Sequence, residues 1–183
     1  MPDFVPFERA IILALDSVCW DLLLPFVENH TMPALGAFLR KASYGVLEST
    51  LPPHTAAAWT TFLTGRDPGQ HGVINFVAFD PRTHRFRFHN SSAHRQSNIL
   101  TRLTDAGVSC GSIFLPCNYP PYPLRDGYIV SGFDTPDTHV RFTEPDDLRD
   151  EVLGVSPRLH FNFDEDWEAV ANDAAFARNI DRA

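Results

Sequence analysis

A short apolar run near the N-terminus constrains the fold more than any other feature of this sequence. Residues 9–15 read RAIILAL, and an acidic residue, Asp16, follows at once. Strands that are buried on both faces of a parallel sheet have this pattern, because neither face meets water. The run therefore predicts a central strand with Asp16 at its carboxyl end, where open α/β sheets place their binding sites.

The rest of the chain alternates between helical and strand-like patterns. Helices are expected over residues 20–29, 33–41, 56–63, 97–106, 145–152 and 166–180, and strands over residues 44–49, 110–115 and 128–131. The polar, basic and aromatic stretch 76–94 is expected to be an inserted hairpin or loop. This alternation predicts an α/β fold, with a mainly parallel sheet that carries helices on both faces.

The chain, residues 1–183, is long enough for one domain with a core. Its composition and charge exclude some classes of binding partner. The formal net charge is −8, and the arginines gather only locally, so we expect no nucleic acid duplex as partner. The longest apolar runs are too short to span a bilayer, and the N-terminus lacks the features of a signal peptide. We therefore expect a cytoplasmic protein with no membrane partner.

Thr55, which carries a hydroxyl group, follows two prolines in the segment Leu51-Pro52-Pro53-His54-Thr55. The prolines enforce an extended approach, and small residues then open the predicted helix, so Thr55 lies at or next to its N-cap. An isolated threonine at such a place is more often a cap than a nucleophile. Asp16 leaves two alternatives open as well, because it could cap the helix that follows or bind a metal ion.

Longer motifs carry more information than these single residues. The stretch LPPHTAAAWTTFLTGRDPGQHGVINF resembles the signature of the type I phosphodiesterase/nucleotide pyrophosphatase family, within the alkaline phosphatase superfamily. The segments IILALDSVCWDLLLPF, SNILTRLTDAGVSCGSIFLPCNYPPYP and GYIVSGFDTPD are similar to further parts of that family. The resemblance implies an alkaline-phosphatase-like core with Asp16 as a metal ligand and Thr55 as both nucleophile and metal ligand.

The resemblance also implies a reaction. Two divalent metal ions, Zn²⁺ or Mn²⁺, would assist cleavage of a phosphodiester or pyrophosphate bond in a small-molecule phosphate ester, through a phospho-threonine intermediate. A phosphomutase or phosphomonoesterase of the same superfamily is the alternative. Asn75, where many relatives have aspartate, is expected to contact substrate, and His71 is expected to order its loop rather than bind metal. Ser17 stands where relatives have glycine and would alter the turn that aims Asp16.

The family's remaining metal ligands are absent from this sequence. In relatives, they lie in an Asp-x-x-x-His segment and an Asp-His-Gly segment, and the sequence has no Asp-His-Gly triplet. We therefore expect the chain to be the N-terminal portion of a catalytic domain and to be inactive by itself, which leaves an inactive truncated fragment as a third interpretation.

Overall fold

The computed structural model describes residues 8–132, 134–157, 159 and 161, and the chain divides into two compact units. The first unit is Met1–Glu48 and the second is Ser49–Ala183. In the described part, no helix has the length and apolar character needed to cross a bilayer. The helix expected over residues 166–180 lies outside the described residues.

The first unit contains two helices, α1 (Trp20–Glu28) and α2 (Pro33–Leu39). Gly36 lets them approach closely, because a Cβ atom at this position would lie 3.0 Å from the Val27 side chain. The chain after α2 returns to the start of α1, where the Trp20 ring packs against Tyr44 and its Nε1 donates a hydrogen bond to the Gly45 carbonyl at 2.8 Å. Both helices were expected from the apolar spacing.

The strands expected at residues 9–15 and 44–49 are not formed. The described residues of this unit contain no strand, and the apolar side chains of both segments are exposed, with Ile11 at 96% and Leu47 at 93%. A strand requires a neighbour that satisfies its backbone N–H and C=O groups, and an apolar run does not supply one by itself.

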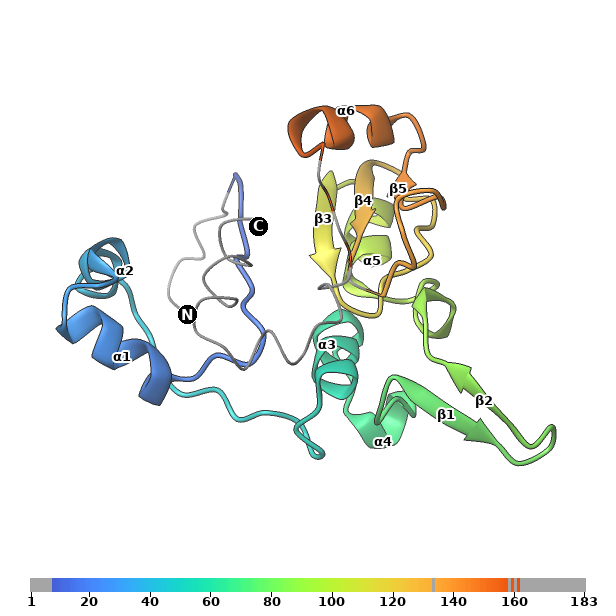
Figure 1. The fold of residues 1–183 in the computed structure, drawn as a ribbon, viewed down its shortest axis with the longest axis horizontal. Coiled ribbons are helices and arrows are strands. Elements are labelled where there is room, and N and C mark those ends of the chain that lie inside the picture. The colour runs from blue at the N-terminus through green and yellow to red at the C-terminus, as the bar shows by residue number, and fades with distance from the viewer. Residues whose placement is uncertain (1–7, 133, 158, 160, 162–183) are drawn as a thin grey trace. The chain divides into compact units, whose positions relative to one another are not determined.

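The second unit carries the remaining elements (Figure 1). They are α3 (Thr55–Thr64), α4 (Pro68–His71), β1 (Val77–Asp80), β2 (Arg85–Phe88), the 3-10 helix η1 (Ser91–Ala93), α5 (Ile99–Asp105), β3 (Cys110–Leu115), β4 (Gly127–Ser131), β5 (Thr143–Glu144) and α6 (Leu148–Val155).

Two small sheets organise this unit. Strands β1 and β2 form an antiparallel hairpin, whereas the second sheet has the order β3-β4-β5, with β3 parallel and β5 antiparallel to β4. The α/β class is thus confirmed at the level of a mixed architecture. The mainly parallel sheet is not, because the two segments expected to extend it, residues 9–15 and 44–49, are not strands and β5 returns antiparallel.

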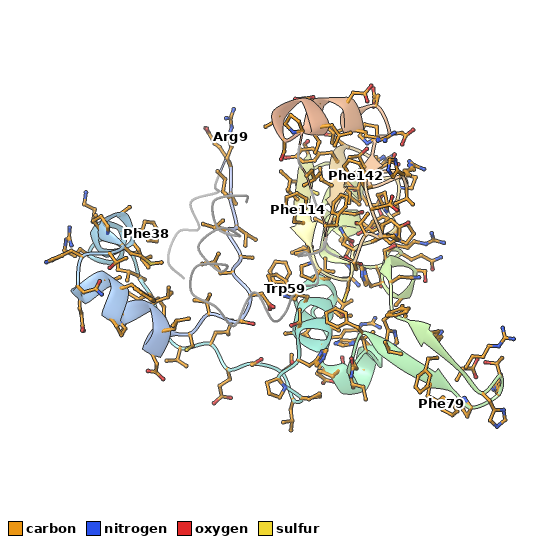
Figure 2. All side chains as sticks on the ribbon, viewed as in Figure 1. Arg9, Phe38, Trp59, Phe79, Phe114 and Phe142 are labelled. Atoms are coloured by element: carbon orange, nitrogen blue, oxygen red, sulfur yellow. The ribbon has the colours of Figure 1, made fainter. Side chains whose placement is uncertain are left out.

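Two apolar clusters hold these elements together. One joins Val130, Phe142 and Phe161, with side chains of α6 packed against it, and Phe142 is labelled beside the sheet in Figure 2. The other joins Ala56 at the start of α3 to Val73 and Cys117. The second cluster holds the start of α3, the helix that begins with Thr55.

Candidate functional site

Thr55 is the first residue of α3. The N-cap is His54, which has an extended backbone and whose Nδ1 accepts a hydrogen bond from the Ala56 amide at 3.2 Å. Gly65 ends the helix in the left-handed conformation, with φ of 65°. Of the two expected positions, at or next to the N-cap, the structure shows the second: His54 is the cap, and the half-buried Thr55 occupies the first helical position.

The underside of this first turn is packed against the body of the unit. Ala56 and Ala57 are fully buried, and Ala56 contacts Val73 and Cys117. Burial raises the pKa of the Cys117 thiol to about 12, so the thiol stays neutral and acts as a packing group rather than a nucleophile. The small alanine side chains permit this close contact, which fixes the backbone that carries Thr55.

The segment after α3 contains the one-turn helix α4. Asp67 caps it by accepting a hydrogen bond from the Gln70 amide at 2.9 Å, and Pro68 takes the first helical position. This Asp-Pro pair is a local signal for a helix start that could have been read from the sequence.

His71, the last residue of α4, ties this loop to α3. Its Nδ1 accepts a hydrogen bond from the Val73 amide at 3.0 Å, and its Nε2 lies 3.0 Å from Thr61 Oγ1. Because Nδ1 accepts a hydrogen bond, Nε2 carries the proton of the neutral ring, and this N–H donates a hydrogen bond to Thr61 Oγ1. Burial lowers the pKa of His71 and so favours the neutral ring, although the nearby Asp67 carboxylate has the opposite, smaller effect. The bonding supports the expected loop-ordering role.

We expect His71→Ala to lower the free energy of unfolding by about 1–3 kcal/mol, because two hydrogen bonds are lost. The pKa of His71 is lower in the folded than in the unfolded state, so its contribution is complete above the unfolded pKa of 6.5 and is lost as the pH falls below it. Urea unfolding at about pH 7.5 and about pH 5.5 measures both effects.

Two variants sharpen this measurement. Thr61→Val removes only the partner of Nε2 and should cost less than His71→Ala. His139→Ala changes an exposed histidine and should leave the free energy of unfolding unaltered. An unchanged pH dependence in His71→Ala would show that other groups cause the acid sensitivity. Among the described residues, His89 and His94 are candidates, because burial also lowers their pKa values.

Asn75 lies just beyond this loop and is exposed. Its Oδ1 accepts a hydrogen bond from the Phe76 amide at 2.6 Å. The Phe76 ring meets the His54 ring edge to face, with ring centroids 5.3 Å apart. The structure thus brings the segment that contains Asn75 to the residue that caps α3, next to Thr55.

Asp16 belongs to the first unit, in an exposed turn with Ser17. The N-cap of α1 is Cys19, so the interpretation of Asp16 as the cap of this helix is wrong. Ser17 has φ of 56°, in the left-handed region that favours glycine, and its Oγ lies 3.5 Å from Asp16 Oδ2. The serine therefore keeps the backbone conformation that a glycine adopts easily.

A buried polar network, which the sequence did not reveal, supports the segment beneath α3. His94 Nε2 donates to the Cys117 carbonyl at 2.8 Å, while Asn98 Nδ2 donates to His94 Nδ1 and to Tyr122. Tyr122 in turn donates to Asn118 Oδ1 at 3.0 Å. Burial lowers the pKa of His94 and raises that of Tyr122 to about 12, so both stay neutral. Two of its links join residues four apart in the sequence, but the links between the 94–98 and 117–122 segments are non-local and were not visible in the sequence.

Asp16 and Thr55 are the candidate metal ligands. The Asp16 carboxylate and the Thr55 hydroxyl are oxygen donors of the kind that bind Zn²⁺ or Mn²⁺. Among the residues that the structure describes, no group of three or more His, Cys, Asp or Glu could hold a metal ion. Both donor types suit a divalent metal ion.

In the comparison with known proteins, one family model matches this chain. The model of the type I phosphodiesterase / nucleotide pyrophosphatase family matches residues 10–183. No curated protein and no solved structure matches the chain. The matched range includes Asp16, Thr55 and Asn75.

Proposed function

The chain belongs to the type I phosphodiesterase / nucleotide pyrophosphatase family, and from this membership we propose that it hydrolyses phosphodiester or pyrophosphate bonds through Thr55. Asp16 and Thr55 are the proposed metal ligands, and Asn75 is the proposed substrate contact. The start of α3 carries the proposal: His54 is the cap, and Thr55 stands at the first helical position above a buried, close-packed turn.

In the proposed reaction, Thr55 Oγ loses its proton and forms a bond to phosphorus. The bond from phosphorus to the leaving oxygen breaks, and the leaving group departs with the electron pair and gains a proton. Water then cleaves the phospho-threonine ester and restores the hydroxyl. A neutral threonine hydroxyl is a poor nucleophile, and a bound divalent cation would stabilise its ionised form and the charge of the phosphoryl group.

The helix start supports the same chemistry. Amide groups in the first turn of a helix point toward an anion placed before it. In α3, His54 Nδ1 holds the Ala56 amide, so a phosphoryl oxygen would displace the His54 ring or bind other amides of this turn. The β-branched side chain of Thr55 has few rotamers, which helps to aim Oγ. The amide nitrogen of Asn75 is the proposed donor to a second phosphoryl oxygen.

Paired reporter substrates test this proposal. We expect the full-length gene product, supplied with Zn²⁺ or Mn²⁺, to cleave bis(p-nitrophenyl) phosphate with a kcat/KM at least about tenfold above that for p-nitrophenyl phosphate. The reverse preference would favour the monoesterase alternative. Turnover of neither these reporters nor a nucleotide pyrophosphate would contradict the proposed activity.

A further inference from the structure

The β1–β2 hairpin separates apolar from charged side chains. Its register pairs Val77 with Phe88 and Phe79 with Phe86, while Ala78 pairs with Arg87 and Asp80 with Arg85. Because side chains alternate between the two faces of a strand, the first two pairs share one face and the last two share the other. The hairpin therefore has a phenylalanine face, formed by Phe79, Phe86 and Phe88, and an arginine face.

The phenylalanine face is open. Phe79, Phe86 and Phe88 are 52%, 75% and 76% exposed, and every residue of β2 is exposed. In Figure 1, the hairpin extends beyond α4, away from the sheet of β3, β4 and β5, and Figure 2 shows Phe79 on this arm. Single exposed apolar residues are ordinary, but three adjacent phenylalanines on a two-stranded ribbon indicate a binding surface.

The same arm concentrates positive charge in a chain whose net charge is −8. Arg82 lies in the turn, and Arg85 and Arg87 lie on β2. The one carboxylate of the hairpin, Asp80, accepts a hydrogen bond from the Arg82 amide at 2.9 Å, and this bond chiefly lowers the pKa of Asp80. Three arginines against one engaged carboxylate leave the arm cationic.

The ribbon geometry lets both groups reach one partner. Each strand of a two-stranded hairpin is an edge strand, so no side chain is enclosed by neighbouring strands. Arginine has a long flexible stem that can lie along an apolar surface while its guanidinium group reaches toward polar surroundings. The guanidinium groups of Arg85 and Arg87 can therefore extend around the edge of β2 toward the level of the phenylalanine rings.

The combination selects one class of partner. A dissolved anion would match the arginines but leave the three rings in water, and an apolar protein surface would match the rings but not the arginines. An anionic lipid surface offers phosphate headgroups directly above an apolar layer. We propose that the β1–β2 hairpin docks on an anionic lipid surface, with Phe79, Phe86 and Phe88 in the boundary layer and the arginines on headgroup phosphates. This proposal replaces the expectation of no membrane partner, although the contact involves no spanning segment, and it does not depend on the proposed hydrolysis.

Vesicle co-sedimentation of the full chain tests whether the β1–β2 hairpin binds lipid. We expect binding to vesicles of three parts phosphatidylcholine to one part phosphatidylglycerol, and much weaker binding to phosphatidylcholine alone. Arg85→Gln with Arg87→Gln should raise the lipid concentration for half-binding by about thirtyfold, because each basic group near such a surface contributes roughly a fivefold gain. Phe86→Ser with Phe88→Ser should weaken binding by at least about tenfold.

Matched controls separate the arm from general effects of charge and apolarity. Arg125→Gln and Phe38→Ser change exposed residues outside the hairpin and should bind as the unaltered chain does. The proposal is overturned by absence of binding to the anionic vesicles, by equal binding to both lipid compositions, or by equal losses in the control variants. A concentration-dependent dimer that Phe86→Ser with Phe88→Ser abolishes, without any lipid binding, would assign the face to a second copy of the chain.

Discussion

Replacing Thr55 by alanine in the full-length gene product is expected to lower turnover of a phosphodiester reporter by at least about a thousandfold. The variant lacks the oxygen that the proposed mechanism joins to phosphorus, whereas alanine is fully compatible with the first turn of α3. The loss should therefore appear in kcat, and thermal unfolding of both proteins measures any change in stability separately.

Two comparisons make the result specific to the nucleophile. Thr55→Ser keeps the oxygen and should retain much of the turnover, with some loss because serine samples more rotamers. Thr138→Ala removes a threonine hydroxyl elsewhere in the second unit and should have no effect. Acid quenching during turnover, followed by peptide mass analysis, should find phosphate on residue 55 in the unaltered protein. Near-native turnover of Thr55→Ala would remove Thr55 from the mechanism.

The sequence predicted α3 well because the signals that define it are local. Pro52 and Pro53 prevent an earlier start, small residues favour the helix, and Gly65 ends it in the left-handed conformation. Each of these effects depends on the backbone within a few residues. The observed helix differs from the expected range of 56–63 by one residue at each end.

The predicted strands at residues 9–15 and 44–49 failed for the opposite reason. An apolar run indicates that a segment is suited to burial, but only a neighbouring strand makes it part of a sheet. The residues of β3 could be predicted from their own pattern, and they also have a partner in β4, with Ile113 beside Val130. Pairing is a non-local property that the run RAIILAL does not contain.

The sequence predicted which residues belong to the candidate site, but not the contacts that these residues make. The motif placed Thr55 and His71 near the same helix, yet the sequence did not indicate that His54 caps α3 or that His71 bonds to both Thr61 and Val73. These roles depend on where each imidazole nitrogen lies in space. Ser17 is the opposite case: the departure from glycine was visible in the sequence, and its φ of 56° lies in the left-handed region that favours glycine.

Replacing Asp16 by asparagine is expected to lower the metal affinity of the full-length gene product by at least about a hundredfold, and its turnover with it. The substitution keeps the size of the side chain but removes its negative charge, and the loss should exceed the 10–100-fold cost of removing a group that only supports a ligand. Because Cys19 caps α1, the variant does not remove a helix cap. Metal content after gel filtration, and turnover as a function of added Zn²⁺ or Mn²⁺, measure the two effects, and excess metal should restore part of the activity.

Asp21→Asn, in the first turn of α1, is the matched control and should retain full metal content. Equal metal affinity in Asp16→Asn and the unaltered protein would show that Asp16 is not a ligand, and the proposed shared role of Asp16 and Thr55 would then be wrong even if Thr55 remained the nucleophile.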